Sequence, residues 1–243
     1  MFHHRDLSIA QYRMFPCHEL AGLRLDVKCD ANRIRFLDFL DGKTLCINLD
    51  GEILQADYLA SKAADRAYFV HTELPFYQYH RGLSFVYDAA SGYITFLYAR
   101  HGHIPEAPRK VEHSVIFAKT GEPSENIAPP CFTDLHVGHQ VDYRYSEGFC
   151  VRHHYLEPHR FCWSITKEHS FPQFIGIPHE EYCDAVRLNG ELFLFSWLEA
   201  ESGTQGAFVL NTTHMRSTGA FFGVGPDGKP ESYTMGAFAE FIK

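Results

Sequence analysis

Residues 20–30 read LAGLRLDVKCD, and residues 136–146 read HVGHQVDYRYS. In each stretch a glycine, Gly22 or Gly138, comes before an alternation of apolar and polar side chains. Such an alternation is typical of a β-strand with one buried face. The likeness of the two stretches indicates that the chain contains an internal repeat.

Three further pairs of segments match in the same order along the chain. The offset in residue number that aligns Gly22 with Gly138 also aligns Cys46 with Cys162, and a slightly larger offset aligns Glu73 with Glu199. The pairs are DGKTLCINL (41–49) with EPHRFCWSI (157–165), AYFVHTE (67–73) with FLFSWLE (193–199), and residues 83–102 with residues 207–228. Loop insertions explain the drift of the offset, so the order of the blocks indicates a duplication.

The two copies are separated by a linker-like segment. Residues 120–134, TGEPSENIAPPCFTD, are rich in Pro, Ser, Asn and Gly. We therefore expect two domains, residues 1–124 and residues 125–243, with the functional site in the second.

Strand patterns and turn signals recur through both copies. Short apolar or alternating runs such as LFLFSWLE are separated by turn dipeptides, among them Asp50-Gly51 and Asn189-Gly190. Only residues 4–15 and 58–66 look helical, and no alternation of strands and helices is present. These patterns predict an all-β fold of two tandem antiparallel barrels of roughly eight strands each, the size that holds one small ligand. A single long sandwich is the rival architecture.

Composition narrows the classes of function. The chain has 243 residues, a net charge of −8, and 21 Phe and 13 Tyr that predict a core rich in aromatic rings. Its 22 Lys and Arg form no basic stripe, and no long apolar run is present, so we expect neither nucleic acid nor membrane as a partner. Seven widely spaced cysteines and the lack of a signal-peptide pattern favour free thiols and a soluble cytoplasmic protein.

Several catalytic and metal-binding signatures are missing. The sequence has no G-x-G-x-x-G or phosphate-loop motif, no G-x-S-x-G elbow and no H-E-x-x-H motif. His101 and His103, with Glu106 and His113 nearby, raise the question of a metal site. Their spacing does not match a barrel metal site, so we expect no metal and no cofactor.

The segment YRYSEGF (143–149) is the first candidate for chemistry. In a strand, Tyr143 and Tyr145 point to the same face. Two neighbouring phenols can bind a carboxylate or a phenolate, or relay a proton. Alternatively, they are aromatic core residues with their hydroxyls at the rim.

The second candidate is the acid that ends LFLFSWLE. Phe195, Trp197 and Glu199 share one strand face, and burial of that face would raise the pKa of the Glu199 carboxyl and suit it to acid–base chemistry. If the strand ends before Glu199, it is a solvated turn residue instead. Glu73, its partner in the repeat, raises the same question.

The second half resembles the C-terminal domain of the MoaF family, which is named for molybdenum-cofactor biosynthesis. The resemblance is carried by Tyr155-Leu156, Trp163, LFLFSWLE, Gly206 and HMRSTGAFFG (214–223). The first half, through LSFVYDAASGYITF (83–96), resembles the N-terminal domain of that family. The resemblance implies lipocalin-like (calycin) barrels. No pterin or molybdenum motif accompanies it.

A more distant resemblance is to phenolic acid decarboxylases, which are cofactor-free lipocalin-like dimers. Their Y-x-Y-x-x-G-[FW] pattern corresponds to YRYSEGF, and their S-W-T-E strand end corresponds to SWLE (196–199). The resemblance implies Tyr143, Tyr145 and Glu199 as catalytic residues. The expected arginine is absent from residues 176–179, where His179 is the nearest candidate for a cation.

These observations leave three hypotheses open: a cofactor-free lyase or isomerase acting on a small aromatic or polyketide-like metabolite, a non-catalytic carrier, and a structural or regulatory protein with filled barrels. In the first two, the partner is a small aromatic ligand, and a homodimer is compatible with the sequence. The expected ligand-contacting residues are Trp163, His179, Trp197, Tyr155 and Phe195. Val27 and Cys29 replace the tyrosine pair in the first half, so that barrel is expected to be structural or to act as a lid.

Overall fold

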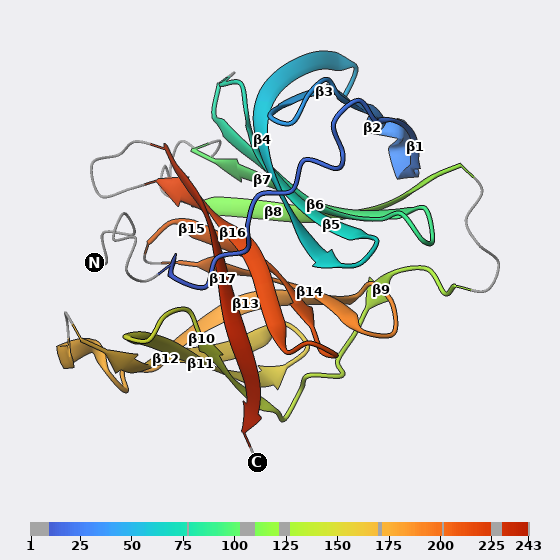
Figure 1. The fold of residues 1–243 in the computed structure, drawn as a ribbon. Coiled ribbons are helices and arrows are strands. Elements are labelled where there is room, and N and C mark those ends of the chain that lie inside the picture. Colours follow the sequence, from blue (N-terminus) through green and yellow to red (C-terminus); the bar gives the residue numbers. More distant parts are fainter. Residues whose placement is uncertain are drawn as a thin grey trace. The chain divides into compact units, whose positions relative to one another are not determined.

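The computed structural model describes residues 10–76, 78–102, 110–121, 127–169, 172–200, 202–224 and 230–242. These residues form seventeen β-strands and two short 3-10 helices, Asp30–Asn32 and Pro172–Phe174. None of the described helices has the length and apolar character needed to cross a bilayer. The predicted all-β class is confirmed (Figure 1).

The first eight strands form a closed antiparallel barrel. Each strand is hydrogen-bonded to the next along the chain, and β1 pairs with β8 to close the ring. The strands are β1 (Arg24–Cys29), β2 (Ile34–Phe39), β3 (Thr44–Leu49), β4 (Glu52–Ala64), β5 (Ala67–Leu74), β6 (His80–Asp88), β7 (Tyr93–His101) and β8 (Val111–Thr120).

Local sequence explains one of its tight turns and misleads at another segment. Asp50 and Gly51 connect β3 and β4 with φ of 51° and 89°. This pair of left-handed residues is what a two-residue hairpin turn requires, as the Asp-Gly signal predicted. The helix predicted over residues 58–66 is wrong, because residues 58–64 belong to β4 and pair with β5. This strand pairing outweighs the helix propensity of the segment's alanines and lysine.

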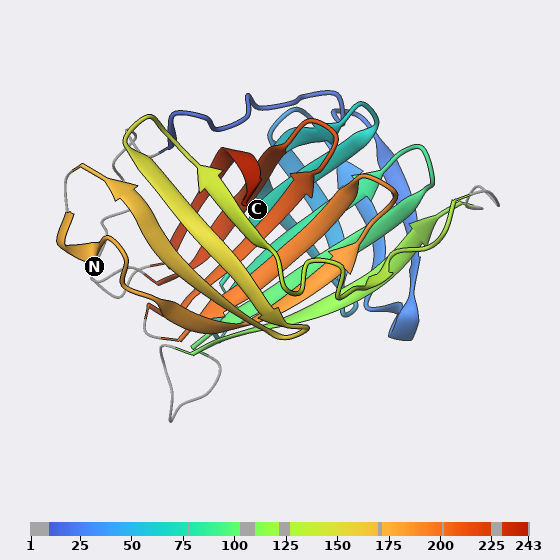
Figure 2. The same cartoon turned by 90° about the horizontal axis from the view of Figure 1, so that it is seen from below.

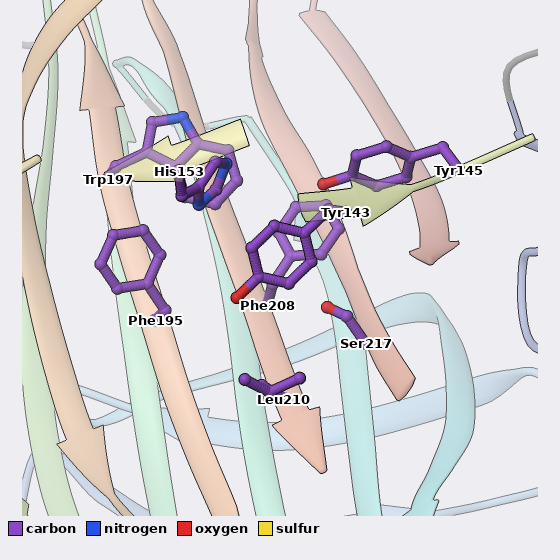
Figure 3. A pocket seen from close by; sticks show the side chains of 8 residues that line it. All are labelled: Tyr143, Tyr145, His153, Phe195, Trp197, Phe208, Leu210 and Ser217. Carbon is purple, nitrogen blue, oxygen red and sulfur yellow. The ribbon is translucent and has the colours of Figure 1, made fainter. Parts of the chain in front are cut away.

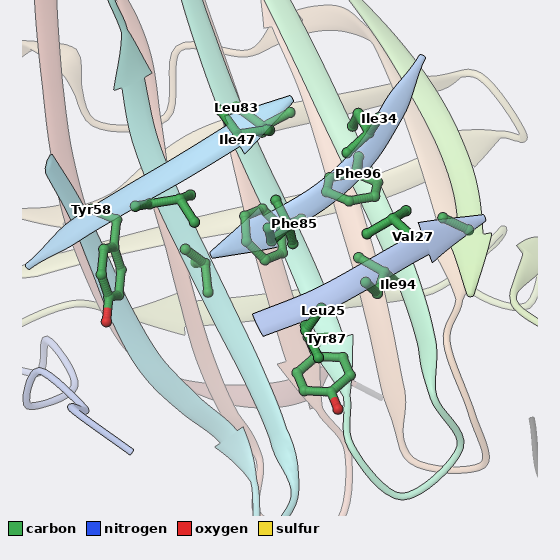
Figure 4. Packing of buried hydrophobic residues seen from close by; sticks show 14 of the residues in the cluster. Leu25, Val27, Ile34, Ile47, Tyr58, Leu83, Phe85, Tyr87, Ile94 and Phe96 are labelled. Carbon is green, nitrogen blue, oxygen red and sulfur yellow. The ribbon is translucent and has the colours of Figure 1, made fainter. Parts of the chain in front are cut away.

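The interior of the first barrel holds a large cluster of buried apolar side chains. Phe39, Phe85 and Phe96 are fully buried, and the Phe85 and Phe96 rings lie 5.1 Å apart (Figure 4). Val27 belongs to this cluster, and the Cys29 thiol lies 3.4 Å from the Ile34 carbonyl oxygen. This close packing is that of a protein core.

The second barrel repeats the same order of strands. Each of eight strands pairs with the next along the chain, and β10 pairs with β17 (Figure 2). The strands are β10 (Gln140–Arg144), β11 (Phe149–Glu157), β12 (Arg160–Glu168), β13 (His179–Arg187), β14 (Leu192–Glu199), β15 (Thr204–Asn211), β16 (Arg216–Val224) and β17 (Pro230–Ile242). The two-residue strand β9 (Cys131–Phe132) pairs with the end of β13 that β12 leaves free. Both sheets close on themselves, so the single-sandwich alternative is wrong.

The matched sequence blocks fall on corresponding strands. The first pair contains β1 and β10, the second β3 and β12, the third β5 and β14, and the last covers β6–β7 and β15–β16. The repeat seen in the sequence is therefore also a repeat of strand order.

The chain divides into two compact units. One comprises residues 15–130, and the other comprises residues 1–14 together with residues 131–243. Residues 122–126, where the sequence placed the domain boundary, lie outside the described part. The described N-terminal residues 10–14 contact the second barrel, where the Arg216 guanidinium donates to the Tyr12 carbonyl at 3.0 Å.

All seven cysteines are free thiols in this structure. Cys183 is buried and the other six are half-buried. The expectation that the chain has no disulfide framework agrees with this arrangement.

Candidate functional site

Strand alternation points aromatic side chains of two strands into the interior of the second barrel. On β14, Phe195 and Trp197 belong to the buried cluster, and Glu199 continues the same face. Tyr143 on β10 and Tyr145, just after this strand, also belong to the buried cluster. Side chains two apart on a strand share a face, so the sequence patterns of both segments place these residues together in space.

A small cavity lies between these rings. Its volume is about 10 Å³, which is close to the room that a single water molecule needs. Eight side chains line it (Figure 3): Tyr143, Tyr145, His153, Phe195, Trp197, Phe208, Leu210 and Ser217. A larger ligand therefore has to displace side chains as it enters.

Both predicted tyrosines line the cavity with protonated hydroxyls. The Tyr143 and Tyr155 hydroxyls are hydrogen-bonded to each other at 2.9 Å. Burial raises the pKa of Tyr143 to about 12 and raises those of Tyr145 and Tyr155 as well. Near neutral pH the three phenols are therefore uncharged and able to donate hydrogen bonds.

Glu199 lies beside the cavity and does not line it. Its Oε1 accepts the indole N–H of Trp197 at 3.0 Å, and its Oε2 accepts the Ser202 hydroxyl at 2.8 Å. Loss of hydration raises the pKa of Glu199 despite these two donors. Trp197 thus links the carboxyl to the cavity, because its ring lines the cavity and its N–H donates to the Glu199 carboxyl.

The repeat partner of Glu199 has a different environment. Glu73 is exposed, whereas Leu74, the next residue on β5, belongs to the interior cluster of the first barrel. A shift of one residue turns every side chain to the opposite face of a strand. The first barrel therefore has no counterpart of the Glu199 carboxyl at that position.

A glycine makes room for the central indole. Gly206 on β15 lies directly opposite Trp197 in the strand pairing. A Cβ atom at Gly206 would come within 2.4 Å of the Trp197 ring. The indole lies flat over the glycine and stacks on Phe208 with centroids 5.3 Å apart. Gly206 is one of the residues that carry the family resemblance. Any larger side chain at this position would clash with the Trp197 ring.

Two of the predicted ligand contacts form a separate pair. Trp163 on β12 and His179 on β13 are directly opposite, and their rings stack at 4.3 Å between centroids. The Trp163 indole nitrogen is buried and has no hydrogen-bond partner among the described residues. Of the five predicted contacts, Trp197 and Phe195 line the cavity, and Tyr155 reaches it through the hydroxyl of Tyr143.

The sequence interpretation missed His153. It did not single out this residue among the candidates, but His153 is only 4% exposed and lines the cavity. Burial lowers its pKa to about 3, which leaves the imidazole uncharged near neutral pH. The alternation of Val151, His153 and Tyr155 on one strand face was the signal that could have placed it inside.

The described residues contain no group of three His, Cys, Asp or Glu side chains arranged to hold a metal ion. His103 and Glu106, two members of the histidine-rich motif, lie outside the described part of the chain. His101 ends β7 in the first barrel. The expectation of no metal and no cofactor stays a prediction.

Residues 130–243, which include the whole cavity, match the family model described as the MoaF C-terminal domain. A curated relative, protein MoaF of Klebsiella aerogenes, is 28% identical over 115 residues, covering 46% of this chain and 42% of the relative. The match therefore spans less than half the length of that relative.

Proposed function

From the match of residues 130–243 to the MoaF C-terminal domain model and from the interior of their barrel, we propose that this protein binds a small aromatic or polyketide-like metabolite there and converts it by acid–base chemistry. The reaction would be a cofactor-free lyase or isomerase step. The observation that carries the proposal is the Glu199 carboxyl, held in a poorly hydrated place beside an aromatic cavity lined by two phenols.

The roles of the groups follow from their protonation. A carboxyl with a raised pKa is a stronger base when ionised and is more readily protonated near neutral pH. Tyr143 and Tyr145 would donate hydrogen bonds to an oxygen of the ligand on which charge develops. Glu199 would act on a ligand that extends past the Trp197 ring toward Tyr145.

A second candidate function is that of a carrier without chemistry. Two observations favour it: Glu199 does not line the cavity, and both of its oxygens already accept hydrogen bonds. In this case the aromatic lining alone would hold the ligand, and the carboxyl would serve to position Trp197.

A binding and turnover screen of the full chain separates the two candidates. The panel contains phenolic acids and neutral phenols, with fluorescence of Trp163 and Trp197 reporting binding and mass spectrometry reporting products. The variants Glu199→Gln and Tyr143→Phe keep the shape of each side chain and remove its proton chemistry. Turnover that both variants lose supports the enzyme, whereas binding without turnover, unchanged in Glu199→Gln, supports the carrier. Glu73→Gln, at the exposed repeat position, is the matched control.

A further inference from the structure

One residue that lines the cavity has a buried polar atom without a hydrogen-bond partner among the described residues. The imidazole of His153 lies against the rings of Tyr143 and Trp197, with centroids 4.7 and 5.4 Å away (Figure 3). Its Nδ1 atom is buried and makes no hydrogen bond to any described residue. A buried polar atom without a hydrogen-bond partner destabilises the folded state. A ligand atom that forms a hydrogen bond with Nδ1 would remove this cost, which favours binding.

The cavity offers no compensating charge to an ion. None of its eight lining residues is Lys, Arg, Asp or Glu. His153 itself is uncharged near neutral pH, because burial lowers its pKa to about 3. The tyrosine hydroxyls can donate hydrogen bonds but carry no positive charge. The Glu199 carboxyl, which accepts a hydrogen bond from Trp197, would repel an anion when ionised.

Three arginines of this barrel are engaged with other groups. Arg152 forms an ion pair with Asp142 at 2.6 Å, and Arg216 contacts Tyr12. Arg187 approaches the Cys131 sulfur at 3.6 Å. A carboxylate ligand would thus lose its hydration without gaining a counter-ion, which is strongly unfavourable.

We infer that the ligand of the second barrel is an uncharged molecule, with an apolar ring among the aromatic side chains and a hydroxyl or carbonyl group hydrogen-bonded to Nδ1 of His153. This rests on the proposed binding function and deepens it, because it selects alcohols, phenols, ketones or aldehydes over carboxylic acids. A neutral imidazole can donate or accept at Nδ1, according to its tautomer, so both kinds of oxygen are suitable.

Three probes of equal size test the inference with the full chain. 1-Phenylethanol, cumene and benzoate have the same number of heavy atoms and differ in the polar group, which is a hydroxyl, absent, or a carboxylate. Isothermal titration at neutral pH measures their affinities. We expect 1-phenylethanol to bind about fivefold tighter than cumene, the effect of one hydrogen bond. Benzoate should bind at least about tenfold more weakly than 1-phenylethanol.

The His153→Phe variant assigns the selectivity to this residue. It should bind 1-phenylethanol and cumene about equally, because the ring remains and the polar atom is gone. His154→Phe, which changes the neighbouring residue on the opposite face of β11, is the control and should keep the wild-type preference. His153→Leu serves as a second variant if near-ultraviolet circular dichroism shows that the first is misfolded.

The outcomes separate this inference from the function on which it rests. Benzoate binding as tightly as 1-phenylethanol, or a preference that survives both His153 variants, would overturn the inference and leave the binding function intact. If none of the three probes binds at millimolar concentration and the screen of phenols also finds no ligand, the proposed function and this inference fail together.

Discussion

His153 shows how a single residue can lie at the centre of a site without belonging to any motif. The tyrosine pair and Glu199 were predicted from short patterns, and the structure places all three in or beside one cavity. His153 was missed because two adjacent histidines say nothing about which of them faces inward. Its strand register, which depends on pairing with β10 and β12, decides that.

The buried imidazole should make stability depend on pH in a defined direction. In the unfolded chain a histidine takes up a proton near pH 6.5, whereas the folded pKa of His153 is about 3. The unfolded state therefore binds more protons between these values, and the stabilisation present above pH 6.5 is lost as the pH falls toward 3. Relative to His153→Phe, the wild type should lose up to about 1.4 kcal/mol of unfolding free energy for each pH unit below 6.5.

Urea unfolding of both proteins at pH 7, 6 and 5 measures this difference. His71 and His136, whose pKa values are lowered by burial to about 4, contribute equally to both proteins and cancel. Val151→Ala on the same strand face controls for lost packing and should follow the wild-type pH profile in parallel. A His153→Phe profile that also runs parallel to the wild type would contradict the prediction.

At the level of the strands, the sequence predicted most of the order in which the strands follow one another. It did not predict, for some strands, which side chains face the barrel interior. Turn dipeptides such as Asp50-Gly51 and the repeated blocks located the hairpins. Glu73 and Glu199 occupy matched sequence positions, yet one is exposed and the other lies beside the interior cavity. Facing is set by the register between strands, and a sequence match that is one residue off reverses it.

The contact between β14 and β15 provides a direct test of this packing. Gly206→Ala would place a methyl group 2.4 Å from the Trp197 ring, so either the indole or the strand must move. We expect a loss of about 1–3 kcal/mol in unfolding free energy and a changed Trp emission spectrum. Chemical denaturation followed by fluorescence measures both quantities. Gly190→Ala, where a Cβ meets open space, is the control, and equal stability of the two variants would refute the proposed packing.

In the whole molecule, the two barrels share an order of strands and differ in what fills them. The first is packed with side chains such as Phe39, Phe85 and Phe96, and the second keeps a narrow cavity among hydroxyls and an imidazole. The expectation that the first barrel is structural or acts as a lid stays a prediction, drawn from Val27 and Cys29 at the positions of Tyr143 and Tyr145. The narrowness of the cavity could not be anticipated, since it depends on how rings from different strands meet.

The division into two units predicts a local response to a core mutation. Phe85 is fully buried, and Phe85→Ala should destabilise the first unit by about 3–5 kcal/mol through the cavity that it leaves. Hydrogen exchange should rise in residues 15–130 more than in residues 131–243. Phe76→Ala is the control in the same unit, because Phe76 is 64% exposed and should change little. An equal rise in both units would show that they unfold as one.

The closure of each barrel by its first and last strands also bears on how such a chain can be rearranged. β1 is hydrogen-bonded to β8, and β10 to β17, so each copy begins and ends on neighbouring strands. A gene in which a linker joins residue 242 to residue 131 and new termini open at the Asn189-Gly190 hairpin should encode the same second barrel as a circular permutant. The same adjacency lets two copies be joined head to tail in one chain, since each barrel closes with its own eight strands and needs no strand from the other copy.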